Sequence, residues 1–206
     1  SFTKVRSLPL RRIPSLRRDF GRSPTGQRGM MNIVRYEECH LPILFQYWHK
    51  IGARVPYFFP ESVEQWPVCL FNDELLGEQI FGHLETFLAL EGNRVLGFIQ
   101  YGQPNFAWNT NGEKVYDLPL GVIRHFYFEP DHPAVGAMLL TEATTALQRF
   151  SPLYAFYHIF GMSCNAHHGK LHSSLGHVDR CLHEHGFQVE HTNVYYVLDM
   201  NRLKLP

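Results

Sequence analysis

Apolar and polar positions follow two periods along the chain, one typical of strands and one typical of helices. Residues 32–37 have the two-residue period of a short strand, and residues 41–53 carry apolar side chains every three to four positions, as in an amphipathic helix. A second helical segment at 61–71 is interrupted by Pro67, and a third begins near Asp73. This part of the chain is therefore predicted to contain one strand followed by two or three helices.

The middle of the chain is rich in strand patterns. Residues 86–102, TFLALEGNRVLGFIQYG, predict a β-hairpin because two apolar runs meet at Gly92 and Asn93. The polar residues 103–119 are predicted to form a loop. Residues 121–130, GVIRHFYFEP, are dense in β-branched and aromatic side chains, which predicts a strand that ends at the proline.

The last third of the chain alternates between helix and strand. Residues 134–150 predict a helix with one apolar face, and residues 152–160 predict a strand. Residues 171–187 predict a helix ended by Gly186, and residues 188–200 close the chain as one strand or two. A hairpin followed by two strand–helix units predicts a mixed α/β sheet with flanking helices.

Composition adds a soluble, intracellular setting to this picture. The 206 residues are 45% hydrophobic, which suits one globular domain with a sizeable core. No apolar stretch approaches the ~20 residues of a membrane helix, so we expect no membrane partner and a cytoplasmic protein. The four cysteines are widely spaced and form no C-x-x-C pair, a pattern that indicates reduced thiols rather than a disulfide framework.

The formal net charge of zero hides a strong asymmetry. Residues 1–30 carry eight Lys or Arg and a single acid, Asp19, whereas the remainder is net acidic. Such a segment before Met30 and Met31 has three interpretations: a transit peptide, a nucleic-acid-binding arm, or non-native sequence ahead of the real start. We therefore divide the chain into a disordered or non-native basic leader, 1–30, and one folded domain, 31–206.

Residues 125–140, HFYFEPDHPAVGAMLL, place a run of small residues where a strand stops and a helix begins. Small side chains let backbone amides approach a neighbour closely, and a helix N-terminus favours anions. The neighbour can be a phosphate or simply the preceding strand.

The order of elements and three local signatures together resemble the GNAT superfamily of acyl-CoA-dependent N-acyltransferases, over about residues 32–200. The signatures are the hairpin RVLGFIQYG, the strand–loop–helix at 122–147, and the closing helix and strand CLHEHGFQVEHTNVYYVLDM. The resemblance implies a GNAT-like fold with a central, mostly antiparallel sheet, splayed parallel strands and flanking helices. It also implies that a pantetheine chain binds backbone between the splayed strands, while loop amides and a helix N-terminus hold the pyrophosphate.

The resemblance implies acetyl-CoA as the acyl donor. Its predicted binding groups are the backbone of the strand and the start of the helix, namely Phe126, Phe128, His132, Ala134, Val135, Gly136 and Ala137. The usual basic residue of the motif is missing, and one register puts Asp131 in its place. No metal is expected: CNAHHGKLH at 164–172 is rich in histidine but lacks an H-E-x-x-H motif and a nearby carboxylate.

Acyl transfer to an amine needs a base, a polarised carbonyl and an acid for the leaving thiolate. The predicted catalytic residues His125, Tyr127 and Glu129 share one face of the strand, and Arg124, Phe126 and Phe128 share the other. By the resemblance, the acid is a Tyr in the last helix, but Leu182 occupies that position. Cys181 and His183 are the nearby substitutes.

The predicted activity is transfer of an acetyl group from acetyl-CoA to a primary amine of a small molecule or peptide by direct attack. One alternative is an acyl-CoA-binding protein without efficient turnover. Another is an interaction module whose basic arm binds nucleic acid, which the acidic folded part disfavours. The sequence does not name the acceptor amine and leaves a homodimer open.

Overall fold

The structure is a computed structural model and describes residues 2–7, 31–55, 62–75, 77–109, 111–116, 118–157, 160 and 170–194. One main sheet forms the middle layer of the molecule. Its strands are β1 (Phe2–Ser7), β2 (Met31–Arg35), β5 (Phe81–Glu91), β6 (Arg94–Pro104), β9 (Gly121–Phe128), β10 (Leu153–Ala155), β11 (Leu171–His172) and β12 (Phe187–Asn193). Their order across the sheet is β11-β1-β10-β9-β6-β5-β2, and β12 pairs with β1.

Within this sheet the pair β9–β10 is parallel, and the other described pairs are antiparallel. The predicted hairpin is the longest ladder: β5 and β6 meet at a turn in which Gly92 has a φ of 60°, a left-handed value that glycine adopts freely. The prediction of a mixed, mostly antiparallel sheet with a parallel pair is confirmed.

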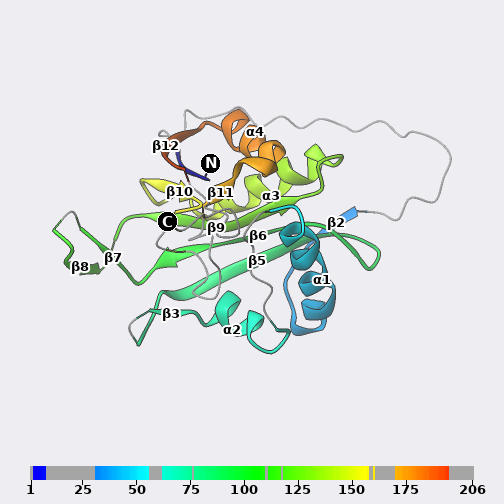
Figure 1. The fold of residues 1–206 in the computed structure, drawn as a ribbon, viewed down its shortest axis with the longest axis horizontal. Helices are drawn as coiled ribbons and strands as arrows, with labels where there is room; N and C mark the ends of the chain where they lie inside the picture. The colour runs from blue at the N-terminus through cyan, green and yellow to red at the C-terminus, as the bar shows by residue number, and fades with distance from the viewer. Residues whose placement is uncertain are drawn as a thin grey trace, which may run out of the picture.

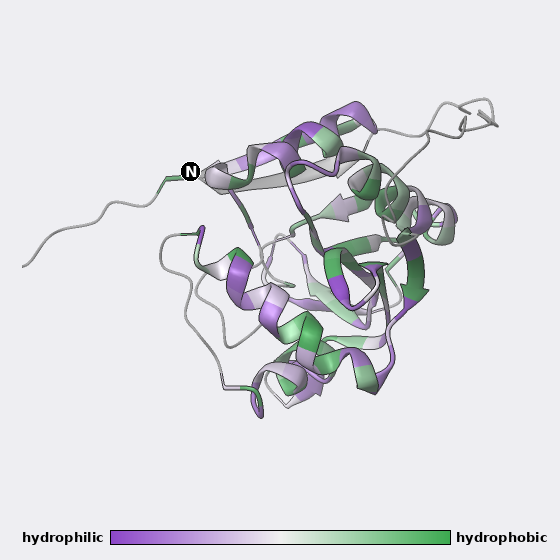
Figure 2. Ribbon diagram, turned by 90° about the vertical axis from the view of Figure 1, so that its right-hand side faces the viewer, coloured by the Kyte–Doolittle hydropathy of each residue, from purple (hydrophilic) through white to green (hydrophobic). Residues whose placement is uncertain are grey.

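Helices cover both faces of the sheet, as Figure 1 shows. The helices are α1 (Leu41–Gly52), α2 (Trp66–Phe71), α3 (Pro133–Ala146) and α4 (Gly176–Glu184), with short 3-10 helices η1 (Glu38–His40) and η3 (Ser173–Leu175). One face carries α3 and α4, and the opposite face carries α1 and α2. Coloured by hydropathy, the helices carry hydrophobic and hydrophilic residues side by side, as expected when one side of each helix is buried (Figure 2).

The core is built from aromatic residues of α1 and the central strands. Trp48 of α1 is 1% exposed, and its ring lies 6.2 Å from that of Phe98 in β6 and 5.6 Å from that of Trp66 in α2. On the other face, Leu139 and Leu140 of α3 are fully buried. No described helix has the length and apolar character needed to cross a membrane.

Two predictions about loops and helices are wrong. The third helix predicted near Asp73 is a small hairpin of β3 (Glu74–Leu75) and β4 (Glu78–Gln79). The predicted loop 103–119 contains a second hairpin of β7 (Phe106–Trp108) and β8 (Lys114–Tyr116). The reason is tertiary: Phe106 is 1% exposed and packs in a cluster with Phe160, which a local pattern cannot indicate.

Pro67 has a different role from the predicted one. It occupies the first turn of α2, where its missing N–H has no intrahelical partner to lose and its fixed φ favours the helix. Pro67 therefore helps to begin α2 instead of interrupting it.

Six residues of the predicted leader belong to the sheet. Phe2–Ser7 form β1, which pairs with β10, β11 and β12. This differs from the expectation that the whole of 1–30 lies outside the fold. Residues 8–30 lie outside the described residues, and the domain boundary at residue 30 stays a prediction.

Candidate functional site

The parallel strands β9 and β10 separate after three paired residues. Gly121, Val122 and Ile123 pair with β10, and the last contact is the N–H of Phe156 on the carbonyl of Ile123, at 3.0 Å. Phe156 then turns the chain away with a φ of 54°, a left-handed value that costs a non-glycine residue about 1–2 kcal/mol. Residues 124–128 of β9, on the side of β10, are called the diverging edge below.

A β-bulge decides which side chains and backbone groups face each direction in β9. Gln100 of β6 pairs with His125 and Tyr101 pairs with Ile123, so Arg124 is an extra residue in β9. Arg124 bonds the carbonyl of Leu70 in α2, and His125 contacts Trp48 in α1. Both side chains therefore point to the face covered by α1 and α2, and the predicted alternation is wrong for Arg124.

The backbone of Phe126 and Phe128 is directed toward the diverging edge. The N–H of Glu129 donates to the carbonyl of Leu96 in β6, at 2.8 Å. Because successive residues of a strand direct their N–H and C=O groups to opposite sides, those of Phe128 point away from β6. The carbonyl of Phe128 accordingly lies 2.8 Å from Nε2 of His177, which belongs to α4. By the same alternation, the N–H and C=O of Phe126 face this side too.

The start of α3 lies directly after the diverging edge. Pro133 opens the helix, and Ala134 is exposed in its first turn. The N–H of Val135 is bonded to the carbonyl of His132 at 3.0 Å. The first amides of a helix have no intrahelical partner and carry a partial positive charge, so this end of α3 favours an anion.

Gly136 is small for a packing reason. A Cβ at this position would lie 2.6 Å from the ring of Phe128, which is itself 3% exposed. The sequence allowed two close neighbours for this small residue, a phosphate or the preceding strand. The structure places the preceding strand β9 where a side chain at position 136 would lie. The predicted binding of acyl-CoA by Gly136 therefore concerns its backbone N–H alone, and it stays a prediction.

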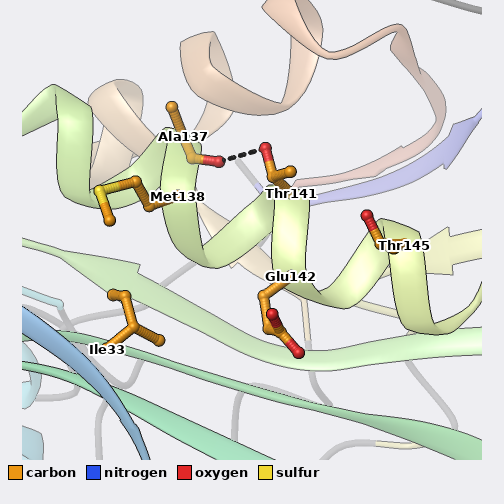
Figure 3. Close-up of a pocket in the computed structure, with 6 residues that line it drawn as sticks. All are labelled: Ile33, Ala137, Met138, Thr141, Glu142 and Thr145. Atoms are coloured by element: carbon orange, nitrogen blue, oxygen red, sulfur yellow. Dashed lines mark hydrogen bonds between the residues drawn. The ribbon is translucent and has the colours of Figure 1, made fainter. Parts of the chain in front are cut away.

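Ala137 lines an open groove of about 480 Å³ between α3 and the edge strand β2. Figure 3 shows its lining residues, Ile33, Ala137, Met138, Thr141, Glu142 and Thr145. Glu142 points from α3 toward the sheet, where it accepts the hydroxyl of Tyr101. Burial, with the negative charge of Glu142, raises the pKa of Tyr101. The groove lies along the side of α3 that faces β2, whereas the diverging edge faces α4.

No family model and no curated protein matches the chain. Among solved structures, it is similar to an integron cassette protein from the mobile metagenome of V. cholerae, at 14% identity and a TM-score of 0.47, over 84% of this chain and 95% of that one. It is also similar to an aminoglycoside acetyltransferase from an uncultured soil metagenomic sample, at 14% identity and a TM-score of 0.48, over 82% and 97%. An aminoglycoside antibiotic 6'-N-acetyltransferase from Acinetobacter haemolyticus is similar at 15% identity and a TM-score of 0.46, over 82% and 99%. Likenesses this distant decide neither substrate nor activity.

The topology of the chain decides the fold class. Among the described strands, a mostly antiparallel sheet contains one parallel pair, and this pair separates beside the N-terminus of α3, as the resemblance implies. This is the architecture that the resemblance implies. β9 and α3 form the strand and helix of the signature at 122–147, and α4 and β12 form the closing helix and strand. Binding of acyl-CoA by the first of these stays a prediction.

Glu129 lies just past β9 and is paired with two cations of the α1 region. One oxygen is 2.6 Å from Nζ of Lys50, and the other is 3.5 Å from Nη2 of Arg54. The carboxylate side chain is only 5% exposed, whereas Lys50 and Arg54 are more than two-fifths exposed. Glu129 thus fastens the end of α1 to the end of β9, and its role as a base stays a prediction.

His125 is a core residue. It is 3% exposed, its ring lies 5.3 Å from that of Trp48, and neither ring nitrogen has a hydrogen-bond partner among the described residues. Burial, with the nearby Arg124 charge, holds the pKa of His125 well below 6.5. The ring is therefore neutral at physiological pH, and its predicted catalytic role finds no support in its surroundings.

The buried ring of His125 makes stability depend on pH. At a pH below 6.5, the ordinary pKa of histidine, His125 is protonated in the unfolded chain but stays neutral in the folded chain. The free energy of unfolding therefore falls as the pH falls from 6.5. The slope from one such group reaches about 1.4 kcal/mol per pH unit. His125→Leu should remove this part of the pH dependence and leave the protein at least as stable at neutral pH, because an unpartnered polar group is lost.

Urea unfolding of both proteins between about pH 8 and pH 5 checks this expectation. His183→Leu is the matched control, because His183 is 46% exposed. Parallel pH profiles for the wild type and His125→Leu would mean that His125 finds a partner for its proton in the folded protein.

Tyr127 combines a half-buried position with access to the diverging edge. Its ring lies 5.9 Å from Trp48 on the α1 face and 5.7 Å from Phe156, the residue at which β10 turns away. Burial raises the pKa of Tyr127, so its hydroxyl stays protonated at neutral pH. Of the three predicted catalytic side chains, Tyr127 is the one that keeps a transferable proton beside the edge.

The last helix, α4, has no tyrosine at the position where the resemblance implies one. Leu182 is fully buried, and Cys181 is 5% exposed with a thiol whose pKa burial raises to about 12. The Nδ1 atom of His183 lies 2.9 Å from the carbonyl of Asp179, within α4 itself. The suggestion that Cys181 or His183 replaces the missing tyrosine stays a prediction.

Two basic residues lie near the predicted loop motif, which lacks the basic residue that the resemblance implies. Lys50 and Arg54 come from the end of α1, 79 and 75 positions before Glu129 in the sequence. Asp131 is 77% exposed and lies 3.9 Å from His132, so its carboxylate is turned to solvent. The two basic residues were missed because nothing local to residues 41–54 indicates which loop they meet.

A second group missed by the sequence is a buried polar network around Arg124. Its guanidinium pairs with Asp73 at 2.6 Å and donates to the carbonyls of Leu70 in α2 and Phe160 beyond β10. The arginine side chain is 0% exposed and the aspartate 3%. The network joins β9 to the segment past the strand divergence.

Among the described residues, no group of three or more His, Cys, Asp and Glu side chains is arranged to hold a metal ion. Most of the histidine-rich stretch 164–172 lies outside the described residues. The expectation that no metal is bound stays a prediction.

Proposed function

We propose that the protein transfers an acetyl group from acetyl-CoA to a primary amine of a small molecule or peptide by direct attack. One observation carries the proposal: among the described residues, the diverging edge of β9 has no parallel strand partner, and it lies directly before the N-terminus of α3. An extended amide chain can add to such an edge as a strand does, and phosphates are stabilised at a helix N-terminus. Acyl-CoA carries both groups in one molecule.

The donor is bound mainly by backbone in this proposal. The C=O groups of Phe126 and Phe128 and the N–H of Phe128 face the diverging edge and suit the amides of pantetheine. The exposed first turn of α3 at Ala134 suits the diphosphate. Lys50 and Arg54 keep more than two-fifths of their side chains exposed and raise the positive potential at this end of the sheet.

Catalysis divides between one backbone donor and one side chain. The N–H of Phe126 polarises the thioester carbonyl, because it faces the edge and needs no rearrangement to do so. The amine nitrogen forms the new bond to the carbonyl carbon while the carbon–sulfur bond breaks. Tyr127 donates a proton to the departing thiolate and is reprotonated from the proton that the amine loses. Glu129 positions α1 through Lys50.

Binding without efficient turnover is a second candidate, and specific observations favour it. Both oxygens of Glu129 lie near cations, His125 is sealed in the core, and Leu182 replaces the tyrosine that the family resemblance implies. A spectrophotometric assay of free thiol release with a panel of primary amines separates the candidates. Tight CoA binding with no thiol release from any amine supports the second one.

Ala134→Glu tests the phosphate end of the proposed site. The acidic side chain should stabilise the first turn of α3 by about 0.3–1 kcal/mol, because it complements the helix dipole. The same charge should weaken CoA binding by about tenfold or more, since like charges about 4 Å apart near a surface repel by about 1–4 kcal/mol. Calorimetric titration with CoA gives the affinity, and thermal unfolding gives the stability.

Met138→Glu is the matched control, because Met138 is 44% exposed on the same helix but faces the β2 groove. It should bind CoA as the wild type does. Equal affinities for Ala134→Glu and the wild type would move the phosphate site away from α3. A wild type that binds no CoA at millimolar concentration would end the acyl-CoA proposal itself.

A further inference from the structure

The carbonyl of Phe128 is already occupied. It points to the diverging edge because the neighbouring N–H of Glu129 is bonded to β6, and it lies 2.8 Å from Nε2 of His177. A carbonyl can only accept, so Nε2 of His177 carries the proton and donates it. A side chain from α4 therefore fills a hydrogen-bonding position that an added strand or an extended ligand would use.

The ring of His177 is held in this place by packing as well. It lies 5.0 Å from the ring of Phe128 at an angle of 83°, an edge-to-face contact. Phe128 in turn packs against Gly136 of α3, so three elements meet around the ring. Burial lowers the pKa of His177, although its hydrogen bond to Phe128 acts in the opposite direction. The lowered pKa keeps the ring neutral, with a single N–H.

We infer that His177 is a latch on the diverging edge, which an extended amide ligand must displace from the carbonyl of Phe128 in order to bind. The inference rests on the proposed function, in which that ligand is the pantetheine chain of acyl-CoA. The protein therefore binds the ligand more weakly than a protein in which the carbonyl of Phe128 is free. The factor is set by the fraction of molecules in which the His177 ring has left that carbonyl. His177 is thus a positioning residue for the edge and not a contact of the reacting atoms.

The latch acts on one part of the ligand only. Its carbonyl lies on β9, whereas phosphates are assigned to the first turn of α3. A ligand with phosphates but no amide chain, such as adenosine 3',5'-bisphosphate, does not compete with His177 for the carbonyl of Phe128. CoA has both parts, so the pair of probes separates the latch from the phosphate site.

The test is calorimetric titration of the wild type, His177→Ala and His177→Gln with CoA and with adenosine 3',5'-bisphosphate. Loss of one hydrogen-bond competitor should make His177→Ala bind CoA about 3- to 10-fold more tightly than the wild type. Its affinity for the bisphosphate should be unchanged. His177→Gln retains an N–H donor and should stay within about twofold of the wild type for both ligands.

His183→Ala is the control for the helix, because His183 lies on the exposed side of α4. In the wild type, the imidazole Nε2 signal of His177 in a nitrogen-15 spectrum should shift when CoA is added. Weaker CoA binding by His177→Ala, or an unmoved signal in the CoA complex, overturns the latch and leaves acyl-CoA binding in place. If neither the wild type nor His177→Ala binds CoA at millimolar concentration, the proposed function fails and the latch fails with it.

Discussion

Arg124→Met should lower the free energy of unfolding by about 3–5 kcal/mol, because it leaves a buried carboxylate without its cation. Asp73 is 2.6 Å from the guanidinium and its side chain is 3% exposed, so water cannot replace the arginine without opening the core. The carbonyl of Phe160 loses the Arg124 donor in the same variant, whereas that of Leu70 still accepts from Nε2 of Gln100. Equilibrium unfolding in urea measures the loss.

Two further variants separate the charge from the volume of the side chain. Arg35→Met removes an arginine that lies 2.8 Å from Glu85; the side chain of Arg35 is 63% exposed. This control should cost no more than about 0.5–1 kcal/mol. Arg124→Met with Asp73→Leu should recover most of the loss, since an apolar pair can replace a buried ion pair. A cost below about 1 kcal/mol for Arg124→Met alone would mean that the network contributes little.

Gly136→Val should destabilise the protein by about 3 kcal/mol, because its side chain has no room beside β9. The added Cβ would lie 2.6 Å from the ring of Phe128, and that ring is confined by its own burial. Gly176→Val is the matched control in the first turn of α4, where an added Cβ meets nothing within 4 Å. The control should change stability by less than about 0.5 kcal/mol.

The coupling between Gly136 and Phe128 can be measured directly. In a Phe128→Leu background the valine has more space, so the two substitutions together should cost less than the sum of their separate effects. Additive costs would show that Gly136 is constrained by something other than Phe128. A Glu at position 136 is a poor probe of phosphate binding for the same reason, because it would disturb packing before it met any ligand.

The sequence predicted well those features that depend on neighbours in the chain. The β5–β6 hairpin needs only two apolar runs and Gly92, and α3 needs only its own apolar face. The separation of β9 from β10 was expected because the family resemblance supplies it. Local pattern cannot state it, since the turn at Phe156 uses a residue type that rarely takes a left-handed φ.

The features that the sequence did not predict depend on contacts between distant residues. Arg124 and Asp73 are 51 residues apart, and Lys50 and Glu129 are 79 apart, so no local window contains either pair. The hairpin of β7 and β8 forms where burial against Phe160 overrides a polar composition. The small residue at 136 has two physical explanations, and only the position of Phe128 distinguishes them.

The extra residue at Arg124 acts like a frame shift in the backbone of β9. Before it, Gly121 and Ile123 direct their amides and carbonyls to β10; after it, that direction passes to Phe126 and Phe128. If the same residues paired with β6 without the bulge, the amides of His125 and Tyr127 would face the edge and the two sets would be exchanged. Deletion of Arg124 should therefore remove the bulge and leave Phe126 and Phe128 directed to the edge, with the loss of the buried Arg124 contacts as its main cost.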